Sequence, residues 1–412
     1  MDPDLSPHPT RSQLVFIMVT MFLNFLGFSV IIPILPFLIS KYTTGTDSTA
    51  LYMGLLLSVY ALCQFISAPG LGTLSDRFGR RPILLISLLG SVVGYLFLGL
   101  GHTLGLYFVG RIIDGLTGGN ISSVYAYMAD ITAPRTRGHY FGLLGAAGGF
   151  GFMLGPALGG VLGHLSLTLP LFVAAGVTLL NVFWGYFILP ESLHPRHRIA
   201  KVHLPHLNPF TQFGHLFGFP KLVRLFLIGF IFFLALNTMY ANNAVFLKDI
   251  FGWSLKEIGL ALFGVGLLDI ITQGYLVRIL LPKIGGVKLT YWGILLAVIG
   301  FSLAFAGFFV RSNLVFYLGL IVLNVGDGFY EPAAAGMISV SVDHQSQGRI
   351  QGAFQGLQSI ARILGPLLAA FAYNLWHGLP YLTEAVLVLV SFLILRSSLP
   401  LFGSDNSSQS NP

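Results

Sequence analysis

Two acidic residues lie four positions apart inside one strongly apolar stretch of the chain. Asp327 and Glu331 occur in the segment NVGDGFYEPAAAG, so in a helix their carboxyl groups share one face. Two carboxylates this close in a medium of low dielectric cannot both ionise at low cost, and we expect one of them to hold a proton. Holding and releasing a proton is the chemistry that a proton carrier needs.

Other charged residues also lie inside apolar stretches, where each costs about 2.5–3.5 kcal/mol unless it has a partner or a polar surrounding. Arg111 and Asp114 are three positions apart and can pair across one helical turn, as a structural pair or as part of a proton or substrate path. Asp269 is a third candidate proton carrier, and Arg362 is a candidate counter-ion for one of the acids. Glu384, near the start of the last apolar stretch, is expected at the membrane interface.

Membrane-spanning helices must position these residues. Hydrophobic residues make up 55% of the 412 positions and charged residues 9%, whereas soluble proteins carry about 25% charged residues. Crossing a bilayer core of about 30 Å takes about 20 helical residues, and apolar runs of that length occur twelve times. The predicted spans are 14–39, 51–74, 82–101, 104–129, 138–163, 168–189, 223–247, 256–281, 288–310, 313–340, 349–373 and 379–397.

One long hydrophilic stretch divides these spans six and six. We predict a tail at 1–13, a first six-helix bundle at 14–189, a linker at 190–222, a second bundle at 223–397 and a tail at 398–412. Segments 137–160 and 347–370 match at an offset of 210 residues, which indicates that the halves are duplicates. The expected fold is an all-α membrane protein with twelve transmembrane helices in two pseudo-symmetric halves.

Basic residues in the gaps between the spans predict the topology. With the N-terminus inside, sixteen of the 22 lysines and arginines fall on the cytoplasmic side and four fall outside. Both termini are therefore expected in the cytoplasm, in a plasma membrane such as a bacterial inner membrane. This placement gives the net charge of +7 a role in topology, so no nucleic-acid partner is predicted.

Several classes of chemistry are not indicated by the sequence. Cys63 is the single cysteine, and neither a G-x-x-x-x-G-K phosphate loop nor a nucleophile elbow occurs, so we expect no enzyme and no cofactor. The linker is rich in histidine, but the spacing does not match a tetrahedral metal site, and we expect a solvated linker without metal. Those histidines are His194, His197, His203, His206 and His215.

Four motifs point to one family. The loop after the second span reads GLGTLSDRFGRRP, the fourth span contains RIIDGLTGG, the fifth contains GFMLGPALGG, and the first contains LGFSVIIPILP. Together they resemble the signatures of the major facilitator superfamily, in its branch of twelve-span drug:proton antiporters, and they are similar to those of the tetracycline exporters. The resemblance is strongest in the first half.

This resemblance implies that Arg111 belongs to the proton or substrate path. It also implies roles for two glycine-containing motifs. The first motif would be a cytoplasmic gate, although its residues can also serve only as topology determinants: Gly72, Asp76, Arg77, Gly79, Arg80 and Arg81. The second would seal a helix face against leak and so favour proton-coupled export over uniport, although helix packing alone can explain it: Gly151, Gly155, Pro156, Gly159 and Gly160.

The sequence departs from the tetracycline exporters at two positions. Asn24 and Gly94 stand where the resemblance implies aspartates in the first and third spans. Since those acids are tied to substrate and proton handling in that group, we do not expect a metal–tetracycline substrate. We expect proton coupling to involve Asp327 and Glu331 instead.

The remaining cavity candidates are amides and aromatic residues, which suit amphipathic solutes. They are Asn24, Gln64, Tyr125, Asn237, Tyr240, Gln273, Tyr330 and Gln358. The sequence thus predicts a secondary active transporter, a monomer in the bilayer, that couples proton entry to efflux of a small organic or drug-like solute by alternating access. Two alternatives stay open: an exporter or facilitator of one metabolite, such as a sugar or amino-acid derivative, and a transporter-like protein that moves lipid or senses a ligand.

Overall fold

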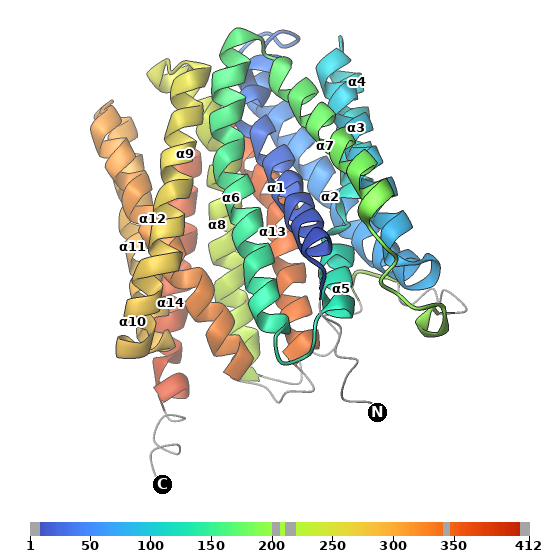
Figure 1. Ribbon diagram of the computed structural model, residues 1–412. Helices are drawn as coiled ribbons and strands as arrows, with labels where there is room; N and C mark the ends of the chain where they lie inside the picture. Colours follow the sequence, from blue (N-terminus) through green and yellow to red (C-terminus); the bar gives the residue numbers. More distant parts are fainter. Residues whose placement is uncertain (1–8, 200–206, 211–219, 341–346, 404–412) are drawn as a thin grey trace. The chain divides into compact units, whose positions relative to one another are not determined.

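The computed structural model describes residues 9–199, 207–210, 220–340 and 347–403, which form helices and connecting turns (Figure 1). The first helices are α1 (Arg11–Ile39), α2 (Thr46–Phe78), α3 (Arg80–Leu100), α4 (Leu104–Gly118), α5 (Ile121–Ile131), α6 (Arg137–Leu165), α7 (Leu169–Ile188) and the short η1 (Pro195–His197). The later ones are α8 (Pro220–Phe251), α9 (Leu255–Ile271), η5 (Thr272–Leu276), α10 (Val277–Ile284), α11 (Gly286–Phe309), α12 (Asn313–Val340), α13 (Gln347–Leu375) and α14 (Leu379–Gly403).

Within these ranges, 11 helices are long and apolar enough to cross a membrane. The prediction of a continuous fourth span at 104–129 is wrong, because α4 ends at Gly118 and α5 begins at Ile121. Gly118 and Gly119 have low helix propensity, and a Cβ atom at Gly119 would lie 2.8 Å from the Cα atom of Ala68 in α2. The break between α4 and α5 thus lies where α2 packs closely, and hydropathy alone does not reveal it.

The chain divides into two compact units, and the first holds most of the early helices. Unit 1 comprises Met1–Gly45, Val59–Thr211 and Trp253–Phe263. In it α1 packs along α6, and α3 packs against α4 and α7. Its core includes Phe16, Leu84 and Tyr127, all fully buried.

Unit 2 comprises Thr46–Ser58, Gln212–Gly252 and Gly264–Pro412. In it α11 packs along α12, while α8 packs against α13 and α14. The first turns of α2 therefore group with the later helices, and the first turns of α9 group with the early ones.

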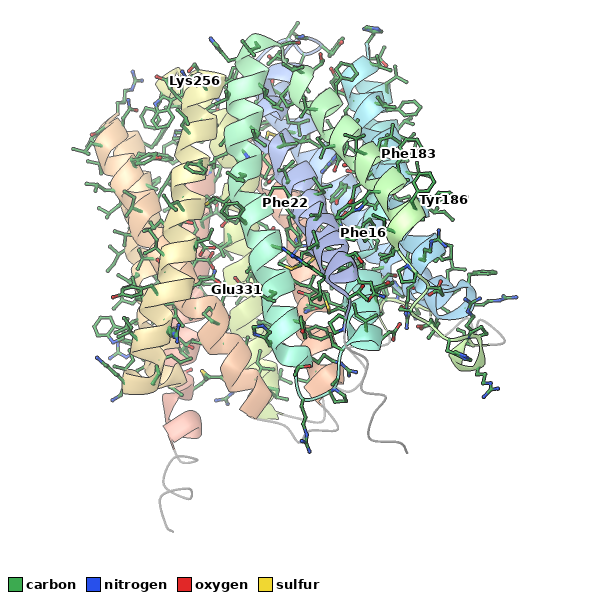
Figure 2. All side chains as sticks on the ribbon, viewed as in Figure 1. Phe16, Phe22, Phe183, Tyr186, Lys256 and Glu331 are labelled. Atoms are coloured by element: carbon green, nitrogen blue, oxygen red, sulfur yellow. The ribbon has the colours of Figure 1, made fainter. Side chains whose placement is uncertain are left out.

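Apolar side chains cover much of the outer surface of the helices. On α7, Phe183 is 55% exposed and Tyr186 61% exposed, and both project away from the neighbouring helices (Figure 2). Exposed aromatic rings of this kind are costly in water and favourable in lipid, so the surface matches a protein whose solvent is the bilayer.

The internal repeat recurs as a repeated packing contact. In unit 1, a Cβ atom at Gly259 of α9 would lie 2.5 Å from the carbonyl oxygen of Pro156 in α6. In unit 2, a Cβ atom at Gly54 of α2 would lie 2.5 Å from the carbonyl oxygen of Pro366 in α13. Because Pro156 and Pro366 are the matched prolines of the repeat, the two units share one way of bringing a glycine against a proline-containing helix.

Candidate functional site

The acids predicted to carry protons gather within unit 2. Asp327 and Glu331 lie one turn apart on α12, and Asp269 reaches them from α9, where a Cβ atom at Gly328 would be 3.4 Å from its Oδ1. The side-chain amide of Gln273 donates to Asp269 Oδ1 at 2.9 Å and is also hydrogen-bonded to Glu331. One amide thus links carboxyl groups from two helices, and we call Asp269, Gln273, Asp327 and Glu331 the acid cluster.

Burial and charge make this cluster able to hold protons. Asp327 is 8% exposed, and its Oδ1 has no hydrogen-bond partner among the described residues. Arg362 of α13, the candidate counter-ion, lies within electrostatic range of Glu331. Three ionised carboxyl groups beside one guanidinium would leave uncompensated negative charge in a buried place, which is costly. The cluster therefore favours a state with at least one proton bound.

A π-helical turn shapes the same place. Gln273 belongs to η5, the π turn Thr272–Leu276 between α9 and α10. Such turns insert an extra residue into a helix and occur often at functional sites. Here the turn begins three residues after Asp269, and the Thr272 side chain packs against Gly328 of α12.

Aromatic candidates lie within electrostatic range of the acid cluster, and the amide candidate on α8 bonds to its own helix. Tyr240 lies within electrostatic range of all three acids, and Tyr330 packs its ring 4.0 Å from that of Phe232. Asn237 donates to the carbonyl oxygen of Phe233 at 2.7 Å, so its amide is engaged by its own helix. The predicted Gln358 lies half-buried on α13.

Unit 1 contains a separate buried ion pair. Arg111 Nη1 lies 3.6 Å from Asp114 Oδ2, so the pairing predicted across one turn of α4 is present. The Arg111 guanidinium also lies 4.0 Å from the ring centroid of Tyr60, and Asp114 is hydrogen-bonded to Ser91. A Cβ atom at Gly94 would be 2.7 Å from Asp114 Cβ, so the α4 acid lies beside the α3 position at which the resemblance implied one.

The predicted amides of unit 1 hold the break between α4 and α5. Asn24 of α1 donates to Asn120 Oδ1 at 3.2 Å, and Gln64 of α2 donates to the Gly118 carbonyl oxygen at 3.0 Å. Tyr125 stacks edge-on against Phe141 at 5.1 Å. Asn120 was not identified from the sequence, although an asparagine after two glycines is a common signal of an interrupted helix.

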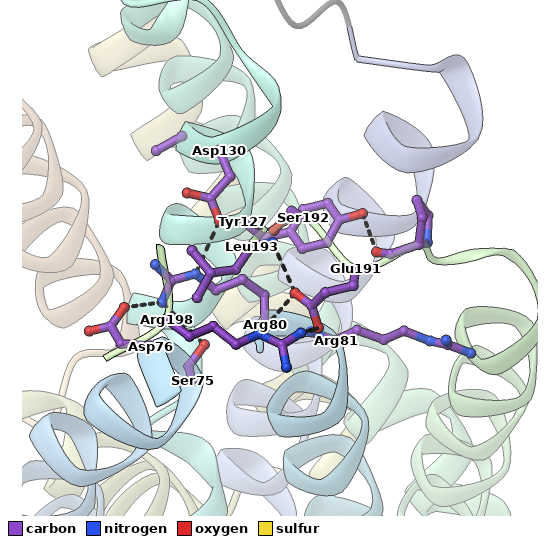
Figure 3. A network of polar contacts seen from close by, with 12 residues as sticks. Ser75, Asp76, Arg80, Arg81, Tyr127, Asp130, Glu191, Ser192, Leu193 and Arg198 are labelled. Carbon is purple, nitrogen blue, oxygen red and sulfur yellow. Dashed lines mark hydrogen bonds and ion pairs between the residues drawn. The ribbon is translucent and has the colours of Figure 1, made fainter. Parts of the chain in front are cut away.

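The α2–α3 turn carries a network of charged groups (Figure 3). Arg80 donates from Nη1 to Asp76 and from Nε to Asp130 Oδ2 at 3.1 Å. Ser192 donates to the same Asp130 oxygen at 2.9 Å. Gly79 has φ 109°, a conformation that disfavours any other residue. The motif thus binds α2 and α3 to the end of α5.

Glu191 completes this network and was missed in the sequence. Its carboxylate accepts from the backbone N–H groups of Arg80 at 2.8 Å and Arg81 at 3.3 Å, at the N-terminus of α3 (Figure 3). A carboxylate at a helix N-terminus satisfies unpaired donors and favours the helix dipole. Arg198 Nη2 lies 3.9 Å from Glu191, so residues after α7 fold back onto the turn.

Two arginines of the motif give a matched test of this network. Arg80 is buried between two carboxylates, whereas Arg77 is exposed and lies 5.1 Å from the ring of Phe78. We expect Arg80→Gln to lower the free energy of unfolding by about 1–2 kcal/mol, since the carboxylates are partly exposed. We expect Arg77→Gln to change it by less than about 0.5 kcal/mol. Unfolding followed in detergent measures both, and equal effects would contradict the assignment of Arg80 as the centre of the network.

The glycines of the fifth-span motif pack closely, but against two helices. Cβ atoms at Gly151 and Gly159 would lie 2.2 Å and 2.4 Å from backbone oxygens of α1, and one at Gly155 would lie 2.0 Å from Ser29 Oγ. A Cβ atom at Gly160 would instead lie 2.8 Å from the Cα atom of Gly259 in α9. The prediction of a close helix partner is confirmed. The prediction of a single face is wrong, because Gly160 directly follows Gly159 and is rotated by about 100° around the helix, toward α9.

Glu384, which was expected at the membrane interface, lies in the second turn of α14. Its side chain is fully buried in α14, and neither carboxyl oxygen has a hydrogen-bond partner in the described part of the chain. The reason is that α14 packs against α8 and α11, and Glu384 lies on the stripe that contains buried Tyr381 and Val388. A carboxyl group in this position is expected to be neutral, because an unpaired buried charge is costly.

Comparison with known proteins agrees with this architecture. The sequence model of the protein family described as Major Facilitator Superfamily matches residues 17–366 and 225–406 of this chain. The chain is 34% identical to the class C tetracycline resistance protein of Escherichia coli over 94% of this chain and 97% of that protein. It is 27% identical to multidrug resistance protein 2 of Bacillus subtilis (strain 168), over 92% of this chain and 93% of that one. The crystal structure of the human organic anion transporter MFSD10 superposes with a TM-score of 0.72 at 24% identity, over 94% of this chain and 99% of that one.

Proposed function

The chain belongs to the major facilitator superfamily, and we propose that it is an efflux transporter that exchanges protons for a small organic solute by alternating access. The observation that carries the proposal is the acid cluster, in which Gln273 links carboxyl groups of α9 and α12 beside buried Asp327. Its relatives, whose names state tetracycline and multidrug resistance, support export as the direction.

The cluster supplies a reason for coupling. With protons bound, it approaches neutrality beside Arg362 and can be buried at low cost. When protons leave, negative charge remains, and a bound solute or new protons must compensate it before the site can be enclosed again. Each passage across the membrane then requires that solute and protons occupy the site alternately, which is antiport.

The solute that fits best is amphipathic. Tyr240 and Tyr330 border the acids, and aromatic rings with few fixed polar groups suit such molecules. A metal–tetracycline complex is not favoured, since neither Asn24 nor Gly94 supplies a carboxylate. Asn24 is hydrogen-bonded to Asn120, and the carboxyl group of Asp114 beside Gly94 is paired with Arg111. We propose a monomer in the plasma membrane with both termini in the cytoplasm.

Everted membrane vesicles test the proposal. Acidifying the lumen should drive uptake of the transported solute from a panel of lipophilic cations, lipophilic anions, tetracyclines and small metabolites. A pH difference of one unit is worth about 1.4 kcal/mol, so one-for-one exchange supports about a tenfold solute gradient. Equilibration of a solute without accumulation, whatever the pH difference, would indicate a facilitator and contradict antiport.

A further inference from the structure

A second group of titratable residues lies in unit 2 where α2 begins and where α8 and α13 end. His377 Nε2, just after α13, lies 3.3 Å from Asp47 Oδ1 in the first turn of α2. The ring of Tyr373 stacks on His377 at 4.6 Å, and its O–H donates to Asp249 Oδ2 at 3.4 Å. Lys248 Nζ lies 3.8 Å from Asp249 Oδ1. We call these five residues the latch.

The charges of the latch leave a place for one proton. Asp249 is 9% exposed and is matched by Lys248 together with the Tyr373 hydroxyl. Asp47 and His377 are more open, at 61% and 39% exposure, so protons from the medium reach the imidazole. Imidazole is the side chain that titrates in the physiological range, and only its protonated form turns this contact into an ion pair. Protonated His377 would then face two carboxylates, Asp47 directly and Asp249 across Tyr373.

The position of the latch connects it to a movement. Further along the same two helices, Ser58 of α2 donates to the Ile363 carbonyl oxygen of α13 at 2.7 Å, and Gly54 packs against Pro366. Opening the membrane face at which α2 begins would part α2 from α13 and so break the contact between Asp47 and His377. In the predicted topology this is the extracytoplasmic face.

We propose that His377 is a proton-binding site, separate from the acid cluster, whose protonation ties α2 to α13 and favours closure of the extracytoplasmic side. The inference rests on the proposed function in one respect, namely that alternating access parts these helices. The ion pair forms only when the imidazole carries a proton, so removing this proton removes the stabilisation. For a partly exposed pair, the closed population should change about two- to fivefold.

Distance measurements test the latch without transport. Spin labels are attached to cysteines introduced by Leu51→Cys in α2 and Leu375→Cys in α13, both at exposed positions, in a Cys63→Ser background. Pulsed electron paramagnetic resonance then measures the distance between the two helices. Asp269→Asn, Asp327→Asn and Glu331→Gln are included in every sample, so that the acid cluster cannot respond to pH. We expect the short-distance population to rise about two- to fivefold from pH 8 to pH 5.5.

Three variants decide the cause. His377→Gln and Asp47→Asn should each remove the pH response, and His377→Arg should keep the short distance populated at both pH values. A pH response that survives His377→Gln, or one that is missing from the parent, would overturn the latch. Because neither solute nor gradient is used, failure of antiport would leave these distances unchanged, and failure of the latch would leave the transport assay unchanged.

Discussion

Asp327→Asn is expected to abolish solute accumulation driven by a pH difference while leaving solute exchange intact. The asparagine keeps the shape of a buried side chain that is 8% exposed but removes the proton that it can carry. Without that proton the pH difference does no work on the solute, so accumulation should fall from about tenfold per pH unit to none. Glu331→Gln should act in the same direction, because the two carboxyl groups lie one turn apart and share the cluster.

Glu384→Gln is the matched control for this prediction. It makes the same acid-to-amide change at a fully buried carboxyl group outside the acid cluster, where a neutral form is already expected. Accumulation should therefore persist in this variant. Uptake and solute counterflow are measured in reconstituted vesicles. Normal accumulation in both Asp327→Asn and Glu331→Gln would show that the acid cluster does not couple proton movement to solute transport.

The second large effect concerns one methyl group on α6. Gly151→Ala should lower the free energy of unfolding by about 1–3 kcal/mol, because its Cβ atom would lie 2.2 Å from the backbone oxygen of Phe22. The oxygen cannot turn aside as a side chain can, so α1 and α6 must separate. Export should weaken as well if this contact seals the transport path.

Gly149→Ala is the control on the same helix. Nothing lies within 4 Å of the position of its Cβ atom, and alanine favours a helix over glycine by up to about 1 kcal/mol. Thermal unfolding in detergent should show opposite signs for the two variants. A Gly151→Ala protein as stable as the parent would show that α1 and α6 do not pack as described.

The spans and the acid cluster could be predicted because each has a strong one-dimensional signal. Apolar runs long enough for a bilayer predicted all the spans except the fourth, and the four-residue spacing placed Asp327 and Glu331 on one face. Asp269 could be named as a candidate from its charge, and its hydrogen bond to Gln273 follows the four-residue spacing of a helix. The π turn of η5 was indicated by no periodicity.

What the sequence missed depends on tertiary contacts. Asp130 and Glu191 stand in polar segments where acids are common, and only the fold brings them to Arg80. The burial of Glu384 likewise follows from the packing of α14 between neighbours, not from its distance to the end of the helix. The break after Gly118 is stabilised by Gln64, from another helix altogether.

Proton movement on addition of solute tests the central claim most directly. Purified protein in vesicles with a trapped pH-sensitive dye is given a solute that it accumulates, with no gradient imposed at the start. Exchange predicts that solute entry drives protons out, so the lumen becomes alkaline with the parent protein and with Glu384→Gln, and stays unchanged with Asp327→Asn. Solute entry without any pH change in the parent protein would contradict the account.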